Sequence, residues 1–372
     1  MVGSVAYEFT SMRSARVREI ECGNVLWASR EQARVVRIDA RCRNESRATA
    51  FGRYLPTKGG QCSSITHRQA KMKKTARTLL LFSFFVSAQS SFLVSAQSFG
   101  GNLRVEEVEF ASHGTTLSGS IMFPANQPIH AAVVFIHGSG KQTRNIGLAE
   151  RFAKEGIVAL VYDKRGAGKS GGEYEGAQSV SEKNIALLAD DAISALKKLS
   201  SHPSLKGIPV GFAGISQAGW IGPLGAEKSN LAKFLVFWSG PVCKVSEEDI
   251  FSKYTSDRDR QTVPTYDEAL RSRKEKYVWP DFLGKDTDPS ESLKKLSIPG
   301  LWLFSDNDGS IPVGLSIERL QALRKDGHRC DYVLFSGLGH NNMDGTFATA
   351  VDWIKRLSKE LLALHSPKLQ RL

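Results

Sequence analysis

The sequence predicts an α/β fold with a doubly wound, mostly parallel sheet that opens on an antiparallel pair of strands. Short, uninterrupted apolar runs are typical of strands buried on both faces, and here they alternate with segments of helical periodicity. This alternation begins near residue 102 and continues almost to the end of the 372 residues. With 41% hydrophobic, 24% charged and 9% aromatic residues, the composition excludes collagenous, coiled-coil and disordered chains.

The first predicted elements are strands. Residues 105–110 and 115–123 alternate apolar and polar side chains, which predicts the antiparallel pair. The runs AAVVFI (131–136) and IVALVY (157–162) predict buried strands, and 146–154 between them has helical spacing that ends at Gly156. This alternation of strands and a helix is the pattern from which the mostly parallel sheet is predicted.

The second half of the chain repeats the pattern after a long amphipathic helix at 181–199. Strands are predicted at 209–215, 234–238, 301–304 and 332–335, and helices at 218–226, 313–325 and 347–362. Between these elements, about residues 242–297 contain charged helical pieces and no buried strand. A long excursion between two sheet strands is usually functional, so we expect a small helical cap over the site. Its aromatic residues either contact a substrate or form the core of the cap itself.

The N-terminal segment has the organisation of a targeting sequence. Met72 to Arg77 is cationic, 78–86 is apolar, and small residues follow up to Ala96, as in a secretory signal peptide. We expect translation to start at Met72, export to the periplasm or the medium, and a mature domain of residues 97–372. Residues 1–71 are then an upstream extension that is non-native or disordered. A long transit segment and an internal membrane anchor are the alternatives, although the apolar run is shorter than the roughly 18–20 residues of a spanning helix.

The formal charge of +12 is concentrated in this N-terminal segment. Residues 1–77 hold 16 Lys and Arg against 6 Asp and Glu, whereas the remaining residues hold 34 against 32. Nucleic-acid binding requires basic residues clustered on the folded part, so no nucleic-acid partner is expected. Cys243 and Cys330, the two cysteines of the predicted domain, have no metal-ligand spacing and are interpreted as buried apolar residues or as a pair.

A serine stands where predicted strand 209–215 meets the next helix, in Gly214-Ile215-Ser216-Gln217-Ala218-Gly219. In G-x-S-x-G, a sharp strand-to-helix turn exposes the serine hydroxyl above the sheet, and small neighbours make room for the turn. Ala218 replaces the second glycine, which keeps the volume low. A plain helix N-cap is the alternative interpretation of Ser216.

A serine nucleophile needs a base and a group that orients the base. His340 follows predicted strand 332–335, and Asp308 follows predicted strand 301–304. Parallel strands end at one edge of the sheet, so the order Ser216, Asp308, His340 predicts a triad there. Asp306 competes for the role of the acid, because it lies only two residues from Asp308.

With these residues, the chain resembles the serine hydrolases of the α/β-hydrolase fold, in the esterase and serine-aminopeptidase-like branch with a small cap. The resemblance covers roughly residues 105–362 and includes three further motifs: His137-Gly138-Ser139-Gly140, Asp163-Lys164-Arg165-Gly166-Ala167-Gly168-Lys169-Ser170, and Asp308-Gly309-Ser310-Ile311-Pro312. It implies that His340 takes the proton of Ser216 and that Asp308 orients the imidazole. The backbone N–H groups of Gln217 and Ser139 would form the oxyanion hole, with Gly140 as the alternative to Ser139.

The predicted function is therefore hydrolysis of a carboxylic ester through an acyl-enzyme on Ser216. A peptidase or an acyltransferase with the same triad is the alternative among enzymes, and the acidic cap residues Glu247, Glu248 and Asp249 would suit a substrate amine. A non-catalytic binding module on a hydrolase scaffold is the alternative outside enzymes. No metal or organic cofactor is implied, the partner is a small ester or amide, and no stable membrane anchor is expected after signal cleavage.

Overall fold

The computed structural model describes residues 26–28, 96–99, 103–176 and 179–364. The chain divides into two units, of which one comprises Met1–Arg34 and Val94–Leu372 and the other Val35–Leu93. All described residues belong to the first unit. The predicted signal peptide, apart from Ala96, and the three N-terminal cysteines lie outside the described residues.

A ten-stranded sheet forms the centre of the first unit and follows the order β1-β10-β9-β8-β7-β5-β6-β4-β3-β2. Pairing is parallel from β1 to β6 along this order and antiparallel from β6 to β2. The strands are β1 (Leu26–Ala28), β2 (Ala96–Phe99), β3 (Leu103–Ser112), β4 (Thr115–Pro124), β5 (Ala131–Ile136), β6 (Ile157–Tyr162), β7 (Val210–Ile215), β8 (Leu235–Trp238), β9 (Gly300–Ser305) and β10 (Cys330–Phe335). The antiparallel start and the parallel remainder confirm the predicted α/β class.

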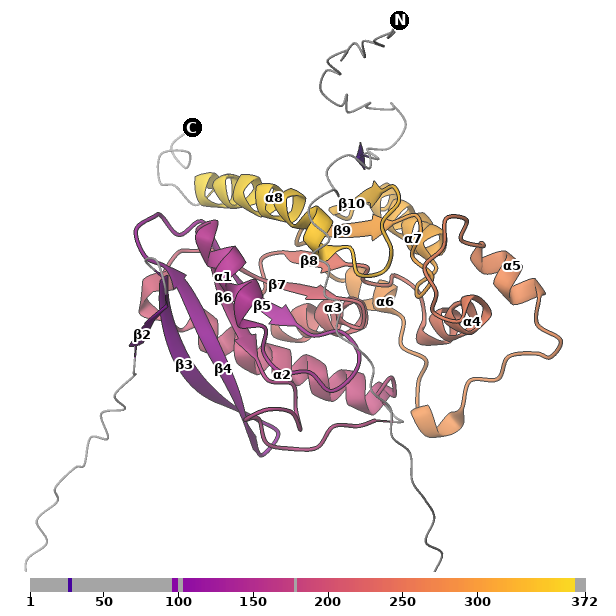
Figure 1. Cartoon of the computed structure of the whole chain (residues 1–372), viewed down its shortest axis with the longest axis horizontal. Helices are drawn as coiled ribbons and strands as arrows, with labels where there is room; N and C mark the ends of the chain where they lie inside the picture. Colours follow the sequence, from indigo (N-terminus) through magenta and orange to yellow (C-terminus); the bar gives the residue numbers. More distant parts are fainter. Residues whose placement is uncertain (1–25, 29–95, 100–102, 177–178, 365–372) are drawn as a thin grey trace, which may run out of the picture. The chain divides into compact units, whose positions relative to one another are not determined.

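Helices cover both faces of the sheet (Figure 1). One core packs the sheet against α1 (Ile146–Lys154) and α8 (Met343–Leu364), through side chains such as Phe152 and Ile354. The other core packs it against α2 (Glu182–Ser200), α3 (Ala218–Ser229) and α7 (Val313–Lys325). Every residue of β5, β6, β8 and β9 is buried, which is why these strands are apolar throughout except for Ser305 at the end of β9.

The predicted helices agree closely with the observed ones, because local signals set their ends. Asn145 caps α1 by accepting from the N–H of Leu148, and Ser181 caps α2 by accepting from the N–H of Asn184. Helix α8 begins four residues earlier than predicted. Its first turn is fixed by a tertiary contact that the sequence does not display, the hydrogen bond from Trp238 Nε1 to Thr346 Oγ1 at 2.9 Å.

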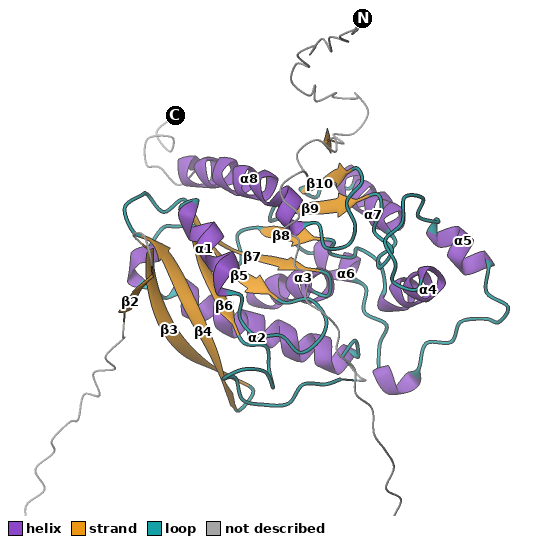
Figure 2. Ribbon diagram, in the orientation of Figure 1, coloured by secondary structure: helices purple, strands orange, loops and turns teal. Residues whose placement is uncertain are grey.

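The segment between β8 and β9 contains helices and loops but no strand among its described residues, as predicted for the cap (Figure 2). It contains α4 (Val245–Thr255), α5 (Tyr266–Arg271), the 3₁₀ turn η3 (Asp281–Leu283) and α6 (Pro289–Leu293); a second 3₁₀ turn, η2 (Pro203–Leu205), precedes β7. Ile250, Phe251 and Ala269 form a small separate core with Tyr266 and Tyr277 packed against it. Several cap aromatics therefore serve the cap's own packing.

Two short strands were not predicted from the sequence. β2 pairs Ala96 with Glu106 at one edge of the sheet, and β1 pairs Leu26 with Val333 at the other. Both lack the length and the apolar alternation from which strands are inferred. Cys243 and Cys330 are free and buried. Within the described residues, no helix combines the length and the apolar content needed to cross a bilayer.

Candidate active site

Ser216 occupies a strained turn between β7 and α3. Its φ of 55° lies in the left-handed region that residues with a side chain rarely adopt. The turn is held from both sides, because the N–H of Ser216 donates to Trp238 O at 2.9 Å and the N–H of Gly219 donates to Ser216 O at 2.8 Å. This is the sharp strand-to-helix geometry predicted for the serine. It differs from the extended backbone that an N-cap residue usually adopts, and the N-cap position of α3 belongs to Gln217.

The small residues around Ser216 have separate steric reasons. A Cβ on Gly214 would lie 2.5 Å from Ala218 Cβ and 2.7 Å from Ile136 O, so glycine at 214 is what admits alanine at 218. A Cβ on Gly219 would lie 2.6 Å from Pro241, at the entrance to the cap. In this chain the second glycine is therefore needed at 219 and not at 218, and the motif reads G-x-S-x-A-G.

Asp308 and His340 contact each other directly. His340 Nδ1 lies 2.9 Å from Asp308 Oδ2 and 3.0 Å from Oδ1, and the two side chains are 15% and 0% exposed. The Asp308 carboxylate also accepts from the N–H groups of Ser310 and Ile311 at 2.9 and 3.1 Å. With Nδ1–H directed at the carboxylate, Nε2 of the imidazole is the nitrogen left to accept a proton.

Asp306, the competing acid, is held elsewhere. Its carboxylate accepts from Ser336 Oγ at 2.8 Å and from the N–H of Gly337 at 2.7 Å. These bonds tie the loop after β9 to the loop after β10, so Asp306 supports the two loops while Asp308 contacts the imidazole.

Ser216 and His340 are both attached to one short segment at the end of β8. Trp238 O accepts from the N–H of Ser216, and the hydroxyl of the next residue, Ser239, donates to His340 O at 2.8 Å. Both Trp238 and Ser239 have no exposed surface. This segment brings the serine and histidine loops together across the sheet edge. In the part of the chain that the structure describes, the Ser216 hydroxyl has no hydrogen-bond partner.

The residues predicted for the oxyanion hole lie against this turn. A Cβ on Gly138 would be only 3.4 Å from Ser216 Cβ, so the 137–140 loop passes directly beside the serine. Among the described residues, neither the N–H of Gln217 nor that of Ser139 has an acceptor. An unpaired N–H at Gln217, which has no exposed surface, is costly unless a ligand oxygen accepts from it. Gly140, with a φ of 88°, remains the alternative to Ser139.

Asp259, in the cap, is a site residue that the sequence did not predict. Its carboxylate accepts from the N–H of His340 at 3.0 and 3.1 Å and from the N–H of Gly309 at 3.1 Å. A Cβ on Gly339 would fall 1.8 Å from Asp259 Oδ2, and one on Gly309 would fall 2.0 Å from Arg258 O. The cap therefore contacts the loop that carries Asp308 at Gly309 and the loop that carries His340 at Gly339.

The three acidic cap residues at the start of α4 have different surroundings. Glu247 pairs with Arg319 at 2.6 Å, and Asp249 accepts from Tyr277 Oη at 2.8 Å. Glu248 has no such partner within the described residues. Burial and the neighbouring carboxylates Asp257 and Asp249 raise the pKa of Glu248 to about 8.

Opposing effects act on the pKa of His340. Burial disfavours the imidazolium, but the hydrogen bond to Asp308 and the negative charges of Asp308, Asp259 and Glu248 outweigh it, so the pKa is raised above its usual value. The imidazolium that forms when the base takes a proton is thereby stabilised.

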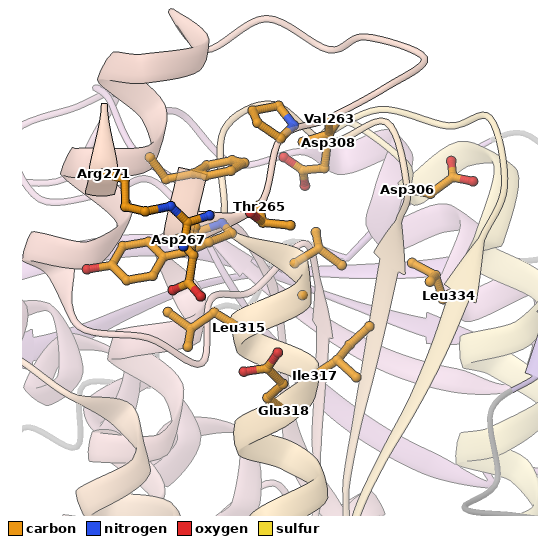
Figure 3. Close-up of a pocket in the computed structure, with 16 residues that line it drawn as sticks. Val263, Thr265, Asp267, Arg271, Asp306, Asp308, Leu315, Ile317, Glu318 and Leu334 are labelled. Atoms are coloured by element: carbon orange, nitrogen blue, oxygen red, sulfur yellow. The ribbon is translucent and has the colours of Figure 1, made fainter. Parts of the chain in front are cut away.

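A cavity of about 390 Å³ lies between the cap and α7 (Figure 3). Arg271 and Asp267 line it from the cap, and Leu315 and Ile317 line it from α7. Asp308 contributes to the wall, whereas Ser216 and His340 do not. No group of three His, Cys, Asp or Glu side chains within the described ranges is arranged to hold a metal ion.

Known proteins share both the sequence pattern and the fold. The serine aminopeptidase family, S33, matches residues 127–256. A protein of Bacillus subtilis (strain 168), "uncharacterized peptidase YtmA", is 24% identical over 241 residues, which are 63% of this chain and 86% of that protein. The crystal structure of acetyl xylan esterase 1 from Thermoanaerobacterium sp. JW/SL YS485 superposes with a TM-score of 0.51 at 16% identity, covering 71% of this chain and 86% of that one.

The chain is a serine hydrolase of the α/β-hydrolase fold. A further relative of the hydrolase, "polyketide transferase claH" of Penicillium crustosum, is 30% identical over 134 residues, 33% of this chain and 42% of that protein. The predicted fold and enzyme class are thus confirmed.

Proposed function

We propose that this hydrolase cleaves carboxylic esters through an acyl-enzyme on Ser216, with His340 as the base and Asp308 as the orienting acid. The observation that carries the proposal is the hydrogen bond from His340 Nδ1 to the buried Asp308, which leaves Nε2 to take the serine proton. The Trp238–Ser239 segment, which is hydrogen-bonded to both Ser216 and His340, would bring the base to the serine.

The reaction would run in two steps. As Ser216 Oγ attacks the ester carbonyl, His340 Nε2 takes its proton, and the carbonyl oxygen becomes an anion held by the N–H groups of Gln217 and Ser139. The imidazolium then protonates the departing alcohol, which leaves the acyl group on Ser216. Water, deprotonated by His340, attacks the acyl-enzyme; as the bond to Ser216 Oγ breaks, His340 returns the proton to this oxygen, and the acid is released. Each oxyanion donor of this kind is worth about 3 kcal/mol of transition-state stabilisation.

Esters are proposed as the substrate class because an alcohol leaves a tetrahedral intermediate more readily than an amine does. The similar fold of acetyl xylan esterase 1 supports an ester substrate, whereas the name of the peptidase relative supports an amide substrate. The transferase name of the fungal relative keeps acyl transfer open as a variant of the second step, in which another alcohol replaces water.

Labelling with a fluorophosphonate, which phosphonylates activated serines, tests this proposal. The purified protein should gain one adduct on Ser216, located by peptide mapping, and should hydrolyse members of an ester panel. Ser216→Ala should remove both the adduct and the turnover without lowering the melting temperature by more than a few degrees, because the side chain is small. His340→Ala should also abolish labelling. An intact label in Ser216→Ala would disprove the assignment.

A peptidase activity is the second candidate, and Glu248 is the observation that favours it. This half-buried carboxyl has no hydrogen-bond or ion-pair partner among the described residues, and its raised pKa would fall on pairing with a substrate ammonium. If aminoacyl amides are substrates, Glu248→Gln should raise KM for substrates with a free amine and leave KM for neutral esters unchanged. If Glu248→Gln leaves KM for the substrates with a free amine unchanged, recognition of the amine by this residue is excluded.

A further inference from the structure

Lys164 is a buried cation beside the predicted oxyanion hole. The residue is 3% exposed, and its Nζ donates to Gly138 O and to Gln217 Oε1, both at 2.8 Å. Within the described residues it has no ion-pair partner. A buried charge without a counterion lowers the stability of the folded protein. We therefore expect Lys164 to serve a function other than stabilising the fold.

The two acceptors of Lys164 lie in the two segments that supply the predicted oxyanion-hole donors, one beside Ser139 and one in Gln217 itself. Gly138 O and the N–H of Ser139 are part of one planar peptide group, on opposite sides of its C–N bond. A bond to this oxygen therefore fixes the direction of the Ser139 N–H and increases its polarity. Gln217 supplies the other donor from its backbone, and its side chain is held by Lys164 and by Ser179 O at 2.9 Å.

The backbone of Lys164 reinforces the same loop. Its N–H donates to Gln142 O at 3.0 Å, and the Gln142 side chain donates to Ser139 O at 2.5 Å. The loop at 138–142 is thus attached to residue 164 at both ends, while Gln217 attaches the same ammonium to the nucleophile turn.

We propose that Lys164 is a positioning residue for the oxyanion hole: it aligns the Ser139 and Gln217 donors, and its uncompensated positive charge stabilises the negative oxygen of the tetrahedral intermediate. This role rests on the proposed function of Ser216. A charge of fixed position and low solvation acts more strongly on a developing anion than the same charge in water. The substrate carbonyl, which is neutral, gains less from it, so the effect belongs to kcat rather than to KM.

Replacement of the ammonium tests this role. Lys164→Met keeps the length of the side chain, and we expect kcat for an ester substrate to fall about 10- to 100-fold while KM changes less than about threefold. A boronic acid, which forms a tetrahedral anionic adduct with the serine, should bind more weakly by a similar factor. Lys164→Arg, which retains the charge, should recover part of the loss. Lys169→Met, at an exposed lysine of the same loop, is the matched control and should behave like the wild type.

The pH profile of the wild type provides a second measurement that does not depend on a variant's folding. Burial lowers the pKa of Lys164 to about 8, so kcat should decline as the pH rises above this value, and Lys164→Arg should lack the decline. A wild-type kcat that stays constant from pH 7 to pH 10 would overturn the proposal, as would a folded Lys164→Met with unchanged kcat and boronic acid affinity. An unlabelled Ser216 in the wild type would instead disprove the proposed function itself.

Discussion

At the scale of single residues, two carboxylates two positions apart have separate tasks. Asp308 contacts the imidazole, whereas Asp306 joins the loops after β9 and β10 through Ser336 and Gly337. Spacing in the sequence could not distinguish them, because both follow the same strand in the same short turn. The distinction comes from the direction in which the turn presents each side chain.

The two carboxylates should therefore respond differently to the same substitution. Asp308→Asn should lower kcat by about 10⁴-fold, because an amide favours the wrong tautomer of His340 and does not stabilise its cation. Asp306→Asn keeps one acceptor oxygen and should cost less than about tenfold. Steady-state kinetics of the two variants on one ester decides this, and equal losses would contradict the assignment of Asp308.

Lys164 shows what else a residue-level interpretation of the sequence missed. It was visible as the second position of the motif that begins at Asp163, but a lysine in a loop is ordinarily solvated. Its acceptors lie 26 and 53 residues away along the chain, and no local pattern signals contacts of that range. Asp259 was missed for the same reason, since His340 lies 81 residues beyond it.

At the scale of elements, the strand ends were predictable, whereas the cap was predictable only as a helical segment and not in its contacts. Uninterrupted apolar runs located β5 to β9, and parallel strands end at one edge, so Ser216, Asp308 and His340 could be assigned to a common edge in advance. The cap lacks such a pattern, because it is a set of short helices with a core of a few side chains. Only the tertiary structure shows that its Asp259 contacts the acid and base loops.

The contact between the cap and these loops gives a prediction for the pH dependence. Asp259 is one of the negative charges that raise the pKa of His340. Asp259→Asn removes this charge, so the pKa of His340 should fall, and the acid limb of kcat/KM, below which the base is protonated, should move to lower pH. The value of kcat on the plateau should also fall, since a neutral amide oxygen accepts from the N–H groups of His340 and Gly309 more weakly than a carboxylate does.

Asp281→Asn is the matched control, because Asp281 is an exposed cap residue at the start of η3 without a side-chain partner among the described residues. Its profile should coincide with that of the wild type. An acid limb of Asp259→Asn that stays in place, or moves to higher pH, would show that the Asp259 charge does not act on the base. Because Asp259 is exposed, added salt should reduce the difference.

At the scale of the whole molecule, the sequence divides into a basic N-terminal part and a nearly neutral hydrolase unit. We propose that the hydrolase is exported by a signal peptide that starts at Met72 and ends near Ala96. Cleavage after Ala96 would leave Gln97, Ser98 and Phe99 to form the edge strand β2, which pairs with β3. The mature chain would then begin at the edge of the sheet.

Expression of the gene from Met72 in a bacterium that has a secretory pathway tests export. N-terminal sequencing of the purified protein should find a start near Gln97 or Gln89, and the protein should be recovered outside the cytoplasm. Replacement of Lys73 and Lys74 by glutamate should keep the protein inside the cell and uncleaved, because a signal peptide requires its cationic start. Residues 72–96 still attached to an exported protein would contradict the cleavage.

The glycines under the cap also constrain how this protein can change over generations. The backbone of Arg258 fills the space beside Gly309, and the side chain of Asp259 fills the space beside Gly339. Whether a larger residue is tolerated at either glycine therefore depends on the cap residue that faces it. An alanine at 339 is incompatible with an aspartate at 259 in its present place, yet it could be accepted once that aspartate had been lost. Substitutions at these positions are therefore epistatic, and among descendants of this chain the cap loop and the two glycines should be inherited or replaced together.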